Sequence, residues 1–465
     1  MLKSEWHALW QHKPLILVLL MIALIPAIYC YLYLSSMWNT YGHTDNIPVA
    51  IVNHDQPATI HGKTIAIGRQ LTHTLSRSDG LDFHHLSEAT AKRRLKAGKV
   101  YLIVTVPRDF SQDATTLLTA HPQQMQLHYT QNSGQNFIVS KITSGMATSI
   151  TTRVSREVTK LNVQALLAAV HGAATGMATA AKGSTELASG SQQLGLGTQK
   201  LLTATAPVHN HTLTTGLTAS QQGIQRLQQG ATTLGQGLTK GHQQLTTIAD
   251  TTTTATALAQ PVAVQSHDIA KVPNNGTGMA PFAIAIGLYV GGIALGTMYD
   301  GAIFYRKPRL ALTWWGSKAS VVGAVALIQS GLLFFTLRQA NGLTVRSESA
   351  LFWAILLGSV LFLSLIFCLR LLLGGFGTWL ISIVLVLQLA SSGGLYPTPL
   401  VSTFAQRLNP WLPMTYLIDL LRSAISTNTD TNTAWGILLS MIVGFNLLVI
   451  LKFHLLMKQD PLAKA

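Results

Sequence analysis

Charge is scarce in this chain. Only 11% of its 465 residues are charged, whereas a soluble globular domain carries about 25%. Because a soluble protein of this length needs more charge to cover its surface, much of this surface must face something other than water. Cysteine is scarcer still. Cys30 and Cys368 are the only two and lie inside apolar runs, which excludes a disulfide framework and a cysteine zinc site.

Acidic residues are also few. The chain has 17 Asp and Glu and 32 Lys and Arg, which gives a formal net charge of +15. A basic chain either binds nucleic acid or lies at an anionic membrane. Since 48% of the residues are apolar, we expect the lipid bilayer as the partner and no nucleic acid.

Motifs for catalysis are missing as well. His61-Gly62-Lys63-Thr64 has the end of a P-loop, but the glycine that should open it falls at Pro57. No His-Glu-x-x-His spacing and no Ser–His–Asp order is found. We therefore expect no enzyme, no cofactor and no metal site.

Long apolar runs are what the chain has instead. A helix needs about 20 apolar residues to cross the hydrocarbon core of a bilayer. Six runs qualify, so the sequence predicts an α-helical polytopic membrane protein with six transmembrane helices. The first covers 14–34, after a short N-terminal segment, 1–13. The others form a five-helix membrane domain within 279–465, at about 280–299, 319–337, 351–369, 374–392 and 434–453.

Positive charges in the short connections give an orientation. With the N-terminus inside, ten Lys and Arg fall on the inner side and four on the outer side, as the positive-inside rule requires. The inner set is Lys3, Lys13, Arg306, Lys307, Arg309, Lys318, Arg370, Lys452, Lys458 and Lys464, and the outer set is Arg338, Arg346, Arg407 and Arg422. We predict a multi-pass protein of the cell membrane with both termini cytoplasmic and residues 35–278 extracytoplasmic.

The first part of the outer segment, 35–134, reads as an α/β domain. Apolar runs rich in β-branched residues, typical of strands, occur at 47–53 and 100–107, and a third strand is expected at 124–130. Helices are expected at 63–77 and 88–98, and another should begin at Asp109. The pattern predicts a mixed sheet with covering helices.

The second part, 135–278, contains two arrays with a seven-residue period. Leucines repeat with the same period as glycines, and Pro207 lies between the arrays, which predicts a long helical hairpin. Glycine inside a helix costs about 1 kcal/mol relative to Ala, so a regular stripe suggests close helix packing. The alternative is a flexible Thr/Gly-rich tether. The expected packing glycines are Gly176, Gly183, Gly190, Gly197, Gly216, Gly223, Gly230 and Gly237.

Polar and small residues inside the spans indicate contacts between helices. Gln329, Gln388 and Asn446 are costly in lipid and are expected to bond to neighbouring helices or to line a polar path. A stripe of glycines from Gly287 to Gly296 is expected to pack against another span.

The segment 393–430 is too apolar for a free loop and too short to span twice. It breaks the helix with two glycines and a proline, so we expect a re-entrant helix at the outer leaflet. Asp419 and Arg422 stand three residues apart and are expected to pair. The candidate outer-gate residues are Gly393, Gly394, Pro397, Asn409, Pro410, Pro413, Tyr416, Asp419 and Arg422.

Four blocks of sequence resemble the YhgE/Pip (phage infection protein) family, whose membrane part is similar to ABC-2-type permeases. The chain departs from that family at Asn39-Thr40, where members often have Asp-Pro. The resemblance covers nearly the whole chain and implies one span, a large outside domain and five further spans. The blocks are 25–29 with Trp38, Tyr41-Gly42, 48–53 and Asp55; 107–111; 272–282; and 391–394 with 412–416 and Arg422.

The resemblance also implies partners. ABC-2 proteins work as dimers with a separate ATPase, so we expect a homodimer and a cytoplasmic ATPase that docks on the basic loop 300–318. Ordinary positive-inside anchoring explains this loop equally well. The candidate coupling residues are Arg306, Lys307, Arg309, Trp314, Trp315 and Lys318.

The function expected from the sequence is a permease-like subunit of an ABC-2-type export system. The alternative is a cell-surface scaffold for phage adsorption or for a secretion machine. Such a scaffold would bind phage or cell-envelope proteins through its hairpin.

Overall fold

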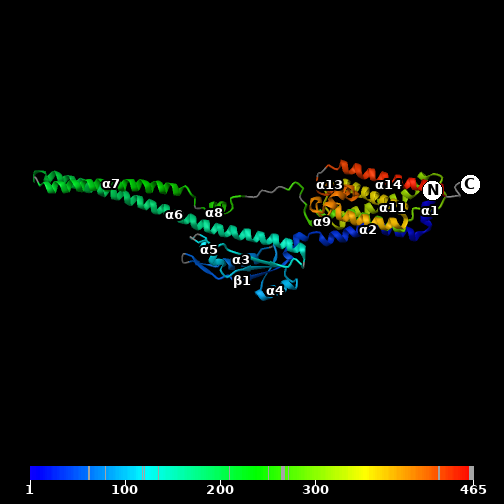
Figure 1. Cartoon of the computed structure of the whole chain (residues 1–465), viewed down its shortest axis with the longest axis horizontal. Helices are drawn as coiled ribbons and strands as arrows, with labels where there is room; N and C mark the ends of the chain where they lie inside the picture. The colour runs from blue at the N-terminus through cyan, green and yellow to red at the C-terminus, as the bar shows by residue number, and fades with distance from the viewer. Residues whose placement is uncertain are drawn as a thin grey trace. The chain divides into compact units, whose positions relative to one another are not determined.

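The computed structural model divides the chain into two compact units, residues 1–43 with 267–465 and residues 44–266. Figure 1 shows their secondary structure. His61 and Gly62 of the incomplete P-loop, and Lys464 of the inner charges, lie outside the described residues. The structure describes residues 1–60, 63–78, 80–117, 119, 121–134, 136–208, 210–249, 251–262, 268–270, 272–427 and 430–459.

The first unit is a bundle of apolar helices around α9 (Asn275–Met298). Of the apolar window of α9, 72% is buried, against 17% for α14. The exposed apolar side chains of α14 are those of a helix that faces lipid. The other helices of the unit are α1 (Leu2–Gln11), α2 (Lys13–Met37), α10 (Ala311–Phe335), η3 (Thr336–Ala340), α11 (Glu348–Ser391), η4 (Thr398–Leu400), α12 (Thr403–Leu408), η5 (Asn409–Trp411), α13 (Pro413–Ile425) and α14 (Asn432–Gln459).

The described residues include six helices that are long and apolar enough to cross a membrane. Five of them, α2, α9, α10, α11 and α14, contain the six runs found in the sequence. α11 holds two of these runs, joined at Gly374, whose φ of 56° and ψ of −127° interrupt the helix. Positive φ at this point favours glycine.

The sixth helix of sufficient length and apolarity is α6 (Phe137–Thr205) in the second unit. Its mean hydropathy of 1.2 is the lowest of the six. At 69 residues it is about 100 Å long, roughly three times the thickness of a bilayer core. It packs on the sheet of the second unit and on a second long helix, which is polar, so it belongs to the second unit.

Glycines of α9 pack against α2 and α11, as the sequence predicted. A Cβ atom at Gly287 would lie 3.3 Å from the carbonyl oxygen of Pro26 in α2. At Gly292 it would lie 2.6 Å from Cδ1 of Ile366 in α11. The absence of side chains therefore sets how closely the three helices approach.

The second unit begins with the predicted mixed sheet. Its strands lie in the order β4 (Asp82–His85), β1 (Pro48–Asn53), β5 (Leu102–Val106) and β6 (His128–Gln131). β1 is parallel to β4 and β5, and β6 is antiparallel to β5. Three strands were not predicted. Residues 63–65 form a strand that pairs with 58–60 rather than the start of a helix, and β4 was missed because its sequence DFHH is polar. η1 (Thr40–Asn46) contains the boundary between the units in the sequence. The elements that follow it are β1, β2 (Ala58–Ile60), β3 (Lys63–Ile65), α3 (Ile67–Ser76), β4, α4 (Glu88–Lys96), β5, α5 (Phe110–Thr116) and β6.

Helices cover both faces of this sheet. Ala50 and Val52 of β1 pack with Leu95 of α4 on one face. Ile51 packs on the other face, in a cluster that includes Ile150 of α6. This alternation follows from the two-residue period of a strand.

α6 then continues as the first arm of the predicted helical hairpin. η2 (Ala206–Val208) leads to the second arm, α7 (His211–Thr246), and the short α8 (Thr252–Ala259) follows. Figure 1 shows α6 and α7 side by side. They run antiparallel, since His242 Nδ1 lies 2.8 Å from the carbonyl oxygen of Ala174 at the far end from the turn. The tether alternative is wrong for this segment.

The predicted packing glycines do not lie between the two arms, which corrects the expectation. A Cβ atom at any of them would meet nothing within 4 Å. The glycines at the contact are Gly195, Gly235 and Gly241, and a Cβ atom at Gly235 would lie 3.3 Å from Cβ of Ser184. The glycines that face open space are Gly176, Gly183, Gly190, Gly197, Gly216, Gly223, Gly230 and Gly237.

Mostly small side chains line the contact between α6 and α7, called the seam below. The period of seven was correct and its phase was wrong by one residue, since Gly190 immediately precedes the buried Ser191. A seven-residue period does not say which of its positions faces the neighbouring helix. Small seam residues let the two backbones approach closely. The buried seam residues are Ala174, Ala181, Ser184, Ser191 and Thr198 on α6, and Ile224, Ala231 and Gly235 on α7.

Candidate functional site

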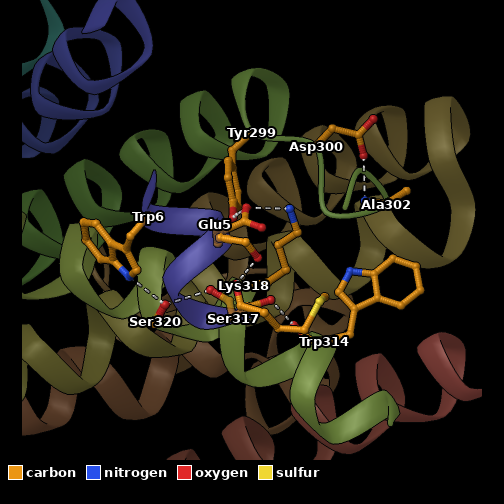
Figure 2. A network of polar contacts seen from close by, with 11 residues as sticks. Glu5, Trp6, Tyr299, Asp300, Ala302, Trp314, Ser317, Lys318 and Ser320 are labelled. Carbon is orange, nitrogen blue, oxygen red and sulfur yellow. Dashed lines mark hydrogen bonds and ion pairs between the residues drawn. The ribbon is translucent and has the colours of Figure 1, made fainter. Parts of the chain in front are cut away.

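A buried ion pair lies at one end of the helix bundle. Lys318 Nζ is 2.7 Å from Glu5 Oε1, and the two residues are 1% and 2% exposed. The hydroxyl of Tyr299 donates to the same carboxylate oxygen at 2.7 Å. Lys318 Nζ also lies 4.9 Å from the centroid of the Tyr299 ring. Figure 2 shows the three side chains converging.

Three separate segments supply this cluster. Glu5 belongs to α1, Tyr299 follows the last residue of α9, and Lys318 lies in α10. Trp6 Nε1 donates to Ser320 Oγ at 3.1 Å and adds a second contact between α1 and α10 (Figure 2). Because an unpaired buried charge is costly, the pair holds the N-terminal helix at one place on α9 and α10.

The structure divides the predicted coupling residues into two groups. Arg306, Lys307 and Arg309 are exposed on the connection between α9 and α10. Lys318 is buried against Glu5, so its charge cannot contact an ATPase, contrary to expectation. α10 begins at Ala311, eight residues before the predicted span at 319, which places this lysine inside the helix.

The two tryptophans of that set contact α14 within the bundle, so they are not available to a docking partner as the coupling prediction expected. Trp314 is 4% exposed, and its ring stacks on Phe453 of α14 with centroids 4.3 Å apart. Trp315 Nε1 donates to Asn446 Oδ1 at 2.9 Å. The candidate docking residues are therefore reduced to Arg306, Lys307 and Arg309.

At the opposite end of the bundle, Arg422 joins two parts of the predicted outer segment. Its Nη2 donates to the carbonyl oxygen of Gly393 at 2.7 Å. Its Nη1 lies 3.5 Å from Asp419 Oδ1, so the expected ion pair forms, with a long contact. One guanidinium thus ties the glycine break after α11 to α13.

Asn409 makes a second tie within the outer segment. Its Nδ2 donates to the carbonyl oxygen of Ser391 at 2.7 Å, and its own carbonyl accepts from Thr415 Oγ1 at 2.8 Å. Tyr416 donates its hydroxyl to the carbonyl oxygen of Pro410 at 2.7 Å. These bonds fold the segment back on itself at the start of α13.

α13 packs into the bundle of apolar helices. It starts at the buried Pro413, which suits the first turn of a helix, and eight of its residues are buried against the other helices. Gly394 lies against the ring of Phe282, and a Cβ atom there would clash with it. Pro397 is exposed and takes no part in these contacts.

The three polar residues predicted inside the spans bond between helices. Gln388 Oε1 accepts from the backbone nitrogen of Met414 at 3.1 Å. Asn446 Nδ2 donates to Ser364 Oγ at 3.1 Å, and Gln329 donates to Ser359 Oγ. The helix-bonding prediction is confirmed for these residues.

A few buried polar atoms near the outer segment remain unpaired. Among the described residues, Gln388 Nε2, Ser391 Oγ and Ser392 Oγ are buried without a protein partner. All three belong to one turn of the end of α11 and its cap. Unpaired polar atoms in a protein interior are costly, so this turn, which directly precedes the outer segment, could accept a polar group.

The sequence reasoning missed Glu5 and Tyr299. Two signals pointed to Glu5 and its partner Lys318: Glu5 lies among apolar and aromatic residues of the first helix, and Lys318 directly precedes an apolar run. A charge at such a position requires a partner, although the sequence does not say which one. In the described chain, no group of three or more His, Cys, Asp or Glu residues is placed to hold a metal ion.

Comparison with known proteins matches this chain to a family and to several relatives. The model of the ABC-2 family transporter proteins matches residues 15–451. YhgE of Bacillus subtilis (strain 168) is 33% identical over 160 residues, which are 34% of this chain and 21% of that protein. The type VII secretion system accessory factor EsaA of Staphylococcus aureus (strain USA300) is 26% identical over 129 residues, 28% of this chain and 13% of that protein. No solved structure matches the chain.

Proposed function

The chain belongs to the ABC-2 transporter family, and from that premise we propose that it is the membrane subunit of an export system in which two copies work with a separate ATPase. It is a multi-pass, permease-like or secretion-associated membrane protein. The observation that carries the proposal is the family match, which extends over residues 15–451. The matched parts cover only 21% and 13% of the two relatives, so what those proteins do is not transferred whole.

Charge supports a cytoplasmic position for one end of the bundle. Lys318–Glu5 and Trp314–Phe453 bring α1, the start of α10 and the end of α14 together. The exposed Arg306, Lys307 and Arg309 lie on the loop that leads into this end. Their excess of positive charge supports placing it inside the cell and placing residues 44–266 outside.

The same loop is the proposed docking site of the ATPase. Three exposed cations on a short connection offer a complementary surface to an acidic patch. The ion pair between Glu5 and Lys318 holds α1 next to this loop. A conformational change of the loop would therefore be transmitted directly to α9 and α10. The outer segment, tied by Arg422 and Asn409, is the proposed gate at the other end.

Purification of the full chain from its native membranes tests the proposal. We expect an ATPase to co-purify, and we expect a triple variant with Arg306→Gln, Lys307→Gln and Arg309→Gln to lose it. The charge-matched control replaces the exposed hairpin residues Lys182, Lys200 and Lys240 with Gln. Absence of any ATPase from the wild-type preparation would contradict the proposal.

A second candidate function is a scaffold for a secretion machine or for phage adsorption. The relative named as a secretion accessory factor and the long hairpin favour it. Met177 and Gly241 face each other in the seam. A variant in which a short turn replaces residues 178–240 therefore tests this function. Loss of partner binding with export intact would favour the scaffold, and loss of export alone would favour the permease.

A further inference from the structure

The hairpin carries a second apolar stripe that its own helices leave uncovered. The residues of this stripe immediately precede seam residues: Leu194 precedes Gly195, and Leu234 precedes Gly235. On α6 the stripe leucines are 49%, 58% and 57% exposed, and on α7 they are 42%, 47% and 55% exposed. In chain order they are Leu187, Leu194, Leu201, Leu213, Leu227 and Leu234.

The stripes of the two helices lie on the same side of the hairpin. Successive residues of a coiled-coil helix are separated by a rotation of about 103° around the helix axis. In both helices a stripe residue directly precedes a seam residue. Each stripe is therefore rotated from its seam by this angle, in the same sense when each helix is viewed along its own chain direction. α6 and α7 run antiparallel, and equal rotations about opposite axes point the same way. The hairpin therefore has one face on which leucines alternate with glycines, called the Leu–Gly face below.

The composition of the Leu–Gly face differs from that of an ordinary solvated surface. Its positions from 176 to 201 and from 213 to 237 hold only Gly, Leu, Ala and Ser, without a charge. Its glycines have open space in front of them. A soluble helix normally places polar side chains on the side that faces water.

The size of the face suits a stable protein partner. A stripe of about 25 residues is about 38 Å long, and two helices about 9 Å apart are about 18 Å wide. The face thus offers about 700 Å² per chain, and two such faces bury about 1,400 Å², within the range of specific interfaces.

We infer that the Leu–Gly face binds the same face of a second copy of this chain, so that two hairpins form a four-helix bundle. The surface is self-complementary, because it presents leucine side chains and glycine gaps at one period. A twofold axis along the hairpin places α6 of one copy against α7 of the other, again antiparallel. Two chains anchored in one membrane also meet at a high effective concentration.

This inference rests on the proposed pairing of two copies and is independent of any ATPase. It also accounts for the phase of the repeat. Small residues suffice in the seam within one chain, and the leucines remain available for contact between chains. A separate protein on this face is the competing occupant.

Cysteine cross-linking of the full chain in membranes tests the inference. The two native cysteines are buried in the bundle, so introduced thiols are the reactive ones. We would treat Leu194→Cys, Leu227→Cys and the double variant with a short bis-maleimide. The matched controls are Ser189→Cys and Thr232→Cys, both at exposed positions. Thr232 directly follows the seam residue Ala231, and Ser189 directly follows Ala188, which lies seven residues after the seam residue Ala181. Both controls therefore lie on the opposite face.

The double variant should give a covalent dimer in most of the protein, and each control less than a tenth of that yield. Leu194→Glu with Leu227→Glu should lower the dimer fraction measured by the particle mass, while Ser189→Glu with Thr232→Glu should not. Equal cross-linking on both faces, or adducts only with a different protein, would overturn the inference. A dimeric particle mass without hairpin cross-links would also overturn it and would leave the proposed pairing of membrane domains intact.

Discussion

Lys318 of α10 and Glu5 of α1 form an ion pair across 313 positions of sequence, with 2.7 Å between Nζ and Oε1. Both side chains are almost fully buried. Each charge therefore depends on the other, since neither reaches water, and Tyr299 adds a further hydrogen bond to the carboxylate.

Removing one member of this pair should destabilise the bundle more than removing both. Lys318→Met leaves the Glu5 carboxylate buried and uncompensated, and we expect a loss of about 3–5 kcal/mol. The double variant Glu5→Leu with Lys318→Met should recover most of that loss. Thermal unfolding of the purified full chain measures both, with the exposed Arg309→Met as control. Additive losses in the double variant would contradict the pairing.

A large side chain at Gly287 should separate α2 from α9. The carbonyl oxygen of Pro26 and Sγ of Cys30 lie 3.3 and 3.2 Å from the position of its Cβ atom. Gly287→Leu should therefore lower stability by about 1–3 kcal/mol or prevent folding. Gly323→Leu in α10, where a Cβ atom meets nothing within 4 Å, is the matched control. Equal unfolding temperatures for the two variants would count against this packing.

Arg422 should control the mobility of the outer segment. Arg422→Met removes the bond to the carbonyl oxygen of Gly393, and a hydrogen bond to a charged group contributes about 1.5–3 kcal/mol. Hydrogen exchange of residues 392–400 should become faster, while that of α2 stays unchanged. Arg407→Met, at an exposed position of α12, should leave both rates as they were. Unchanged exchange in the Arg422 variant would show that the tie does not hold the segment.

Hydropathy and small-residue patterns predicted the parts of this fold that follow from local sequence. The apolar runs gave the helices of the bundle, and Gly287 and Gly292 gave the packing of α9. The seven-residue repeat gave the hairpin. The seam was placed one residue out of phase, because leucines appeared better suited to it than Ala174 and Ser184.

The ion pair was beyond sequence reasoning for a different reason. Pairing of Glu5 with Lys318 depends on how α1 folds back onto α10, which no local pattern specifies. The burial of Trp314 was missed because α10 begins before its apolar run does. In both cases the residue type could be read from the sequence, but the contacts that determine its role depend on tertiary packing.

Labelling of single cysteines on intact cells tests the central claim, the orientation of the chain across the membrane. Ser189→Cys on the hairpin and Arg309→Cys on the basic loop are compared with a membrane-impermeant maleimide, before and after permeabilisation. The account predicts that the hairpin cysteine is labelled on intact cells and that the loop cysteine is labelled only after permeabilisation. Labelling of the loop on intact cells, with the hairpin protected, would contradict it.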